Sequence, residues 1–248
     1  ETPNPCIACN DHIKFGALLQ YAKTLQACAV ATGHYARIDH DATVGRWRLR
    51  RALSPEKDQS YVLFNLTQDQ LAGARCPIGE LTKPQVREVA RRLGLVTAEK
   101  PDSQDVCFVR DRDKDGFLRR ELRLGDTPGP ITDTSGEVLG HHRGLLGYTI
   151  GQREGLGIAV GKPLYVVALD EPNNRLVVGS REELLASTMT AERVHWVSIP
   201  PPGTSLRAQV KIRARHEGAA ATVEPLGNGR VRVDFDEPQS AIAPGQAT

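Results

Sequence analysis

The stretch CAVATGHY, residues 28–35, decides the fold class of the chain. Its run of apolar residues is typical of a buried strand, and the glycine near its end predicts a turn. Open α/β sheets bind their ligands at the carboxyl ends of their strands. We therefore predict an α/β domain whose ligands bind close to Gly33 and His34.

The segments around this strand fit the same fold class. Apolar residues recur every three or four positions from residue 13, which predicts an amphipathic helix to about Gln26 with Asn10 as its N-cap. The other expected elements are a hairpin over residues 36–53, a helix from Thr67, and a helix from Thr82 to Gly94. Residues 1–112 are therefore interpreted as one α/β domain.

The remainder of the chain predicts two further domains. A short charged helix near residues 117–122 leads into glycine-rich loops, and this change indicates a small central domain over residues 113–163. From residue 164 onward, strand-like runs alternate with turn signals, of which Asn228-Gly229 is the strongest. We expect residues 164–248 to form a β-barrel that is closed or nearly closed.

The composition excludes several classes of protein. The 248 residues are 40% hydrophobic and 25% charged with a formal net charge of +2, which is typical of a soluble protein with more than one core. No run approaches the roughly 18 apolar residues of a membrane helix, and the first residues lack the pattern of a secretory signal. We expect a cytoplasmic protein without a membrane partner. No phosphate-binding G-x-x-x-x-G-K-[ST] motif occurs in the chain.

Three of the five cysteines are candidates for chemistry. Cys6 and Cys9 form a C-x-x-C motif, and Cys107 would join them if its segment returns to the same edge of the sheet. A structural zinc site is disfavoured because a second C-x-x-C is missing. An iron-sulfur cluster with one open position and a thiol relay through a persulfide both remain open interpretations, as does a purely structural role. Cys28 and Cys76 are interpreted as ordinary apolar positions.

Two stretches carry regularly spaced positive charge. RWRLRR, residues 46–51, alternates arginine with apolar residues along an expected strand. The stretch LRAQVKIRARH, residues 206–216, is expected to place four cations on one strand face: Arg207, Lys211, Arg213 and Arg215. A solvated outer face is the plainer interpretation, whereas phosphate binding would use such an all-positive face.

Seven motifs together resemble the tRNA-specific 2-thiouridylase family, in the same order and at similar intervals. They are TPNPCIACN, ATGHYAR, KDQSYVL, GELTKPQVREVA, KPDSQDVCF, YTIGQREGLGI and FDEPQSAIAPGQ. The resemblance covers essentially the whole chain. It implies a Rossmann-like ATP-pyrophosphatase-type domain, a central tRNA-binding domain and a β-barrel, which together hold the anticodon arm of a tRNA.

The resemblance also implies the reaction. The family uses ATP, with magnesium expected, to adenylate the C2 oxygen of the wobble uridine, and then replaces that oxygen with sulfur. Cys107 matches the cysteine that carries the persulfide, which a sulfur donor protein supplies. Cys9 matches the second catalytic cysteine, which would resolve the persulfide as a transient Cys9–Cys107 disulfide.

Further positions match contact residues of the family. Asn4, Pro5 and Cys6 match the segment at the target base, and Gly33 matches a glycine at the ATP. The positions that match tRNA contacts are His34, Lys57, Asp58, Gln59, Arg213, Ala214 and Gln246.

The chain departs from the family pattern in two ways. Cys6 stands where many members have aspartate, which supplies a third thiol and keeps the iron-sulfur interpretation open. The family's pyrophosphate-binding loop lies upstream of the first motif and is absent from these 248 residues. We therefore expect that these residues alone do not bind ATP productively and that the intact protein does. A non-catalytic tRNA-binding protein is the remaining alternative.

Overall fold

The computed structural model describes residues 4–100, 107, 109, 114–121 and 127–248. The chain divides into two compact units, which are treated separately. The first, here the α/β unit, comprises Asn4–Gln104 and Arg193–Thr204. The second, here the β unit, comprises Glu1–Pro3, Asp105–Glu192 and Ser205–Thr248.

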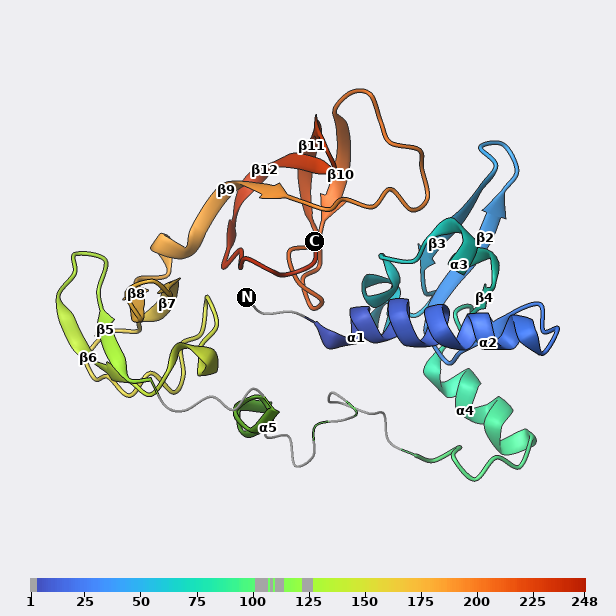
Figure 1. Cartoon of the computed structure of the whole chain (residues 1–248), viewed down its shortest axis with the longest axis horizontal. Coiled ribbons are helices and arrows are strands. Elements are labelled where there is room, and N and C mark those ends of the chain that lie inside the picture. Colours follow the sequence, from blue (N-terminus) through green and yellow to red (C-terminus); the bar gives the residue numbers. More distant parts are fainter. Residues whose placement is uncertain (1–3, 101–106, 108, 110–113, 122–126) are drawn as a thin grey trace. The chain divides into compact units, whose positions relative to one another are not determined.

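The α/β unit begins with a long helix that has a π-helical middle. The segments α1 (Pro5–Ala8), η1 (Cys9–Ala17, π-helical) and α2 (Leu18–Thr24) follow one another without a break, as the blue ribbon of Figure 1 shows. Asn4 is the N-cap, and its side-chain oxygen accepts a hydrogen bond from the Cys6 N–H at 3.1 Å. The expectation that Asn10 caps this helix is wrong. Proline is well suited to the first helical position, so Pro5 allows the helix to begin six residues earlier.

Strands and short helices pack against this long helix. Strand β1 (Val30–Ala31) pairs in parallel with β4 (Ala74–Arg75), and β2 (Ala36–Asp41) pairs with β3 (Arg46–Arg51) as the expected hairpin. The helices expected at Thr67 and Thr82 are α3 (Gln68–Ala72) and α4 (Lys83–Arg92), and each threonine takes part in a capping box. Two 3₁₀ turns, η2 (Pro55–Lys57) and η3 (Ser60–Leu63), complete the unit.

The core of the α/β unit joins the helix to the strands. Its fully buried members are Phe15, Ala36, Leu63, Leu66, Leu71 and Ala74. Since Phe15 comes from η1 and Leu63 from η3, one apolar cluster fixes the start of the helix against the strands and the 3₁₀ turns. The α/β class expected for this part of the chain is confirmed.

The first sheet of the β unit has the strand order β6-β5-β8-β7. Its strands are β5 (Gly129–Thr132), β6 (Val138–His142), β7 (Tyr165–Asp170) and β8 (Arg175–Gly179). Helix α5 (Lys114–Glu121) precedes it, and the turns η5 (Leu145–Gly147) and η6 (Glu182–Leu184) lie within and after it in the chain. A boundary at residue 164 would cut this sheet, because β7 and β8 bond to one another and β8 bonds to β5. The strands after residue 164 therefore do not all belong to one barrel.

The second sheet of the β unit has the order β10-β11-β12-β9. Its strands are β9 (Leu185–Ala191), β10 (Leu206–Val210), β11 (Ala219–Gly227) and β12 (Arg230–Ser240). The hairpin predicted at Asn228-Gly229 joins β11 to β12, and both residues have the positive φ of a type I′ turn, 50° and 68°. In the described part of the chain no helix combines the length and apolar character needed to span a membrane.

The shared core predicts a large cost for a single truncation. Leu71 is 0% exposed, so Leu71→Ala is expected to lower the free energy of unfolding of the α/β unit by about 2–5 kcal/mol. Val96 is 101% exposed and provides the control, because Val96→Ala should change the free energy of unfolding by less than about 0.5 kcal/mol. Both tryptophans, Trp47 and Trp196, lie in this unit, so urea unfolding followed by tryptophan fluorescence reports on it. Equal midpoints for the two variants would contradict this account of the core.

Candidate functional site

The start of the long helix presents two thiols. Cys6 is exposed in the first turn, Cys9 is partly exposed one turn later, and both are free. The Asn4 cap and Pro5 fix the backbone at this end of the helix, because the cap accepts a hydrogen bond and proline restricts its own φ. The thiols therefore stand on ordered backbone and not on a mobile loop.

The segment that follows β1 lies beneath this helix. His34 is only 7% exposed, and its ring centroid is 6.1 Å from that of Phe15. The Thr32 hydroxyl and His34 Nδ1 are 2.8 Å apart and share a hydrogen bond. Burial, together with the positive charge of Lys14, lowers the pKa of His34 to about 4. The imidazole is therefore neutral near pH 7.

Gly33 differs from its neighbour because it is exposed. Apart from Gly33 itself and its two chain neighbours, no atom of the described residues lies within 4 Å of the position that a Cβ at Gly33 would occupy. A backbone with open space above it at the carboxyl end of a strand suits close approach of a ligand. The sequence-based prediction of a site at residues 33–34 therefore falls on an accessible glycine and a buried histidine.

The third segment, residues 57–59, is hydrogen-bonded to Tyr35, which directly follows Gly33 and His34. The Gln59 side-chain oxygen accepts from the Tyr35 N–H at 3.0 Å, and the Gln59 N–H donates to the Tyr35 carbonyl at 2.8 Å. The Asp58 carboxylate accepts from the Ala52 N–H at 2.9 Å and from the Ser60 hydroxyl at 2.8 Å. Asp58 therefore shapes its own loop.

Asn10 links the helix to this third segment. It is 2% exposed, and its Nδ2 donates to the Val62 carbonyl in η3 at 3.0 Å. Sequence reasoning placed Asn10 at a helix start and missed this role, as it missed Thr32 and Tyr35. In the sequence, the role of Asn10 was indicated only by the position of a polar residue within the apolar pattern of the helix. Three segments distant in sequence are thus joined: the helix start, residues 32–34 and residues 57–63.

Cys107 belongs to the β unit, and Cys9 to the α/β unit. Cys107 is exposed, free and in a turn. Most of its motif, KPDSQDVCF, lies outside the described residues, so the predicted convergence of the three thiols stays a prediction. Among the described residues, no group of three or more His, Cys, Asp or Glu side chains is placed to hold a metal ion.

The basic stripe expected after residue 206 is wrong as a strand face. Strand β10 ends at Val210, so Arg213 and Ala214 lie in the bend and turn that follow. Arg207, which is on the strand, is paired with Asp236 at 2.7 Å. Arg213 instead donates to the neutral Ser240 carbonyl at 3.2 Å and forms no ion pair with the described residues. A hollow of about 590 Å³ borders Arg213 and is also lined by Glu217, Asp236 and Glu237. Gln246 lies partly exposed near the end of the chain.

Two arginines of β3, Arg48 and Arg50, are paired with aspartates of β2. Arg48 donates to Asp39 at 2.6 Å and to Asp41 at 2.8 Å, and Arg50 donates to Asp39 at 2.9 Å. These bonds hold the pKa of the Asp39 carboxyl below its ordinary value, Arg48 contributing most. Arg46 donates to the Trp196 carbonyl at 2.7 Å. This row joins strands and segments, which makes it a poor phosphate-binding face.

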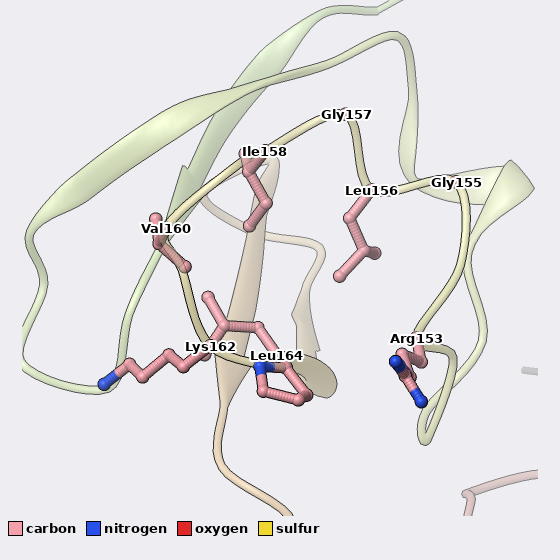
Figure 2. A pocket seen from close by; sticks show the side chains of 9 residues that line it. Arg153, Gly155, Leu156, Gly157, Ile158, Val160, Lys162 and Leu164 are labelled. Atoms are coloured by element: carbon pink, nitrogen blue, oxygen red, sulfur yellow. The ribbon is translucent and has the colours of Figure 1, made fainter.

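A glycine-rich loop in the β unit encloses a small hollow. Figure 2 shows the loop arching from Arg153 to Leu164, with the side chains of Leu156 and Ile158 pointing to its inner side. The hollow has a volume of about 210 Å³, below the roughly 300–1,000 Å³ of small-molecule sites. Arg153 and Lys162 stand at the two ends of the arch (Figure 2). The hollow is therefore smaller than the usual site for a whole cofactor.

Comparisons with known proteins extend over the whole chain. Three family models match in order: the tRNA methyl transferase HUP domain over residues 1–111, its PRC-barrel domain over residues 115–180, and the aminomethyltransferase beta-barrel domain over residues 186–248. HUP domains are Rossmann-like.

Individual relatives give the same result. The tRNA-specific 2-thiouridylase MnmA of Koribacter versatilis is 47% identical over 252 residues, which cover 100% of this chain and 68% of the relative. The protein of that name from Trichormus variabilis is 51% identical over 99% of this chain and 70% of its own length. The one from Moorella thermoacetica is 50% identical over 100% of this chain and 69% of its own length.

The buried histidine predicts a pH dependence of stability. The pKa of His34 is about 4 in the folded chain and about 6.5 when the side chain is exposed in the unfolded chain. Between pH 6.5 and pH 4, His34 is therefore protonated in the unfolded chain and neutral in the folded chain. Stability should therefore fall as the pH is lowered from 6.5 to 4, by up to about 3 kcal/mol from this group. His34→Gln should lose less stability than the wild type over that range in urea unfolding. His12→Gln is the control, because the His12 side chain is 78% exposed, and it should follow the wild type. Parallel curves for all three proteins would contradict the assignment.

Proposed function

The chain belongs to the family of the tRNA-specific 2-thiouridylases, and from that membership we propose that it is a sulfurtransferase that replaces the C2 oxygen of the wobble uridine of a tRNA with sulfur. The observation that carries the proposal is the identity of about half the residues along the entire chain, across all three matched domains. The accessible thiols at an ordered helix start and the accessible Gly33, which belong to the same α/β unit, support it.

ATP supplies the adenylyl group that converts a poor leaving group, the carbonyl oxygen, into a good one. Gly33 is proposed to lie against the nucleotide, since nothing fills the space above its Cα. Magnesium would be held chiefly by the phosphates of the nucleotide, as is usual for this ion. The remaining phosphate contacts are not assigned to residues of this chain.

The two catalytic cysteines are proposed to share the sulfur transfer. The terminal sulfur of a Cys107 persulfide attacks C2, and AMP leaves with the original oxygen. The Cys9 thiolate then attacks the inner sulfur, which stays on Cys107. This breaks the persulfide S–S bond, leaves the outer sulfur on the base and forms the Cys9–Cys107 disulfide. An external thiol must return two electrons before the next cycle.

The target base is proposed to meet the helix start. Asn4 and Pro5 hold the first turn in one conformation, and the exposed Cys6 lies in that turn. The base must leave its stack, because C2 of a stacked base offers little access to a nucleophile. The 57–59 loop and His34 are proposed to line the approach of the tRNA. Asp58 contributes through the shape it gives the loop, and the buried His34 is a neutral hydrogen-bonding group.

The anticodon arm is proposed to reach Arg213, Ala214 and Gln246 in the β unit, and a sulfur donor protein to reach the exposed Cys107. A second candidate keeps the reaction but makes Cys6, Cys9 and Cys107 ligands of an iron-sulfur cluster. The observation that favours it is the presence of two free cysteines one turn apart on the same helix.

Mass spectrometry separates these two mechanisms. The full-length protein, which includes the upstream pyrophosphate-binding loop, is purified without oxygen and treated with a cysteine-derived sulfur donor. It is expected to carry an additional sulfur on Cys107 that disappears when ATP and tRNA are added. Cys107→Ser should abolish both the additional mass and thiouridine formation. An unmodified Cys107 in a brown, iron-containing sample would overturn the persulfide relay in favour of the cluster.

A second test concerns the tRNA-binding surface. Arg213→Ala is expected to weaken tRNA binding. Because one phosphate contact is lost, the slope of log K for tRNA binding against log salt concentration should become shallower by about 1. Arg207→Ala is the matched control, since Asp236 already compensates that charge, and its slope should equal that of the wild type. Equal slopes for all three proteins would remove Arg213 from the tRNA interface.

A further inference from the structure

Cys6 and Cys9 lie three residues apart at the start of the long helix. The Cys9 N–H is hydrogen-bonded to the carbonyls of both Pro5 and Cys6, and Cys9 has α-helical backbone angles, φ −61° and ψ −42°. Residues three apart on a helix are neighbours on one face. The two thiols therefore lie on the same side of the helix.

Among the residues that the structure describes, neither thiol has a bonding partner. Both cysteines are free, with Cys6 exposed and Cys9 partly exposed, so each is accessible to a reagent. Side chains three residues apart on a helix have Cβ atoms about 5–6 Å apart, whereas a disulfide needs about 3.5–4.5 Å. Closing the bond would therefore bring the two Cβ atoms about 1–2 Å closer at the start of the helix, where Pro5 donates no backbone hydrogen bond. In disulfide oxidoreductases, C-x-x-C motifs form reversible disulfides between cysteines with this spacing.

We propose that Cys6 and Cys9 form a reversible disulfide across this turn, and that Cys6 is a second resolving thiol. In the exchange, the Cys6 thiolate attacks the Cys9 sulfur of the Cys9–Cys107 disulfide. The bond between Cys9 and Cys107 breaks, Cys107 leaves as the thiolate, and the disulfide now joins Cys6 to Cys9. No net oxidation occurs, and the proton of the Cys6 thiol goes to solvent or to Cys107.

Without the exchange, Cys107 cannot accept a new sulfur until its disulfide with Cys9 has been reduced. The exchange would separate these two steps. Cys107 becomes available for a new persulfide while the oxidised pair waits for a dithiol reductant, which supplies the two electrons. Attack by Cys6 is intramolecular and one turn away, which gives it an advantage over thiols in solution. This step rests on the proposed function, because only that reaction supplies the Cys9–Cys107 disulfide.

The local disulfide can be tested independently of catalysis. The Cys107→Ser chain, equilibrated in glutathione redox buffer, quenched with acid and digested, is expected to contain a peptide with a Cys6–Cys9 bond. The same variant with Cys28→Ser added is the control, because Cys28 is also an exposed free cysteine and its loss should change nothing. Glutathione adducts on Cys6 and Cys9 without any internal bond would overturn the proposed disulfide.

The exchange itself is tested by comparing first and later turnovers. With limiting dithiol, Cys6→Ser is expected to reduce the ratio of later turnovers to the first several-fold, and to accumulate a Cys9–Cys107 disulfide that the wild type does not. Cys28→Ser should leave the ratio unchanged. An unchanged ratio in Cys6→Ser, or a loss confined to the first turnover, would overturn the exchange. If the wild type makes no thiouridine, the proposed function fails and the exchange with it, whereas the local disulfide is judged by the first experiment alone.

Discussion

The packing of Phe15 against the strands positions the part of the candidate site that lies in the α/β unit. Phe15 is 1% exposed in the apolar cluster that also contains Leu63, and its ring contacts the buried His34. Because Phe15 lies in the helix that begins at Pro5, burying it fixes the height and rotation of the thiols at the helix start. A core residue thus orients surface chemistry that it never touches.

Polar contacts then complete what the apolar core begins. Asn10 holds the helix to η3, and Gln59 holds the following loop to Tyr35. A buried amide bonded to a carbonyl accepts little displacement, because breaking the bond would leave a desolvated polar group. The π-helical stretch that includes Asn10 is consistent with such a constraint, since π-helical turns are frequent at functional sites. Apolar packing and these few bonds together make the helix start a rigid platform.

Charge in this protein is used in two different ways. Arg48 and Arg50 of β3 and Arg207 of β10 are paired with aspartates, so they mainly join segments of the fold. Arg213 donates to the Ser240 carbonyl and forms no ion pair within the part of the chain that the structure describes, so its charge can act on a polyanion. Regularly spaced arginines in a sequence can therefore be structural or can remain available to bind a polyanion. Which of the two applies depends on whether acidic residues lie on the neighbouring strand.

The sequence alone determined the local elements and the family, because periodicity, capping residues and the Asn228-Gly229 turn act over a few positions and ordered motifs are read directly. It located the hairpins, the helices after Thr67 and Thr82, and the thiols. Only the tertiary structure decided that Asn4 and not Asn10 caps the helix, that β7 and β8 join the sheet of β5, and that Arg207 is compensated by Asp236. The strand pairing and the Arg207–Asp236 pair depend on residues distant in the sequence. The helix cap depends on a choice between two asparagines, each of which is a suitable N-cap. Burial, strand pairing and charge compensation are properties of neighbours in space, which a linear pattern does not specify.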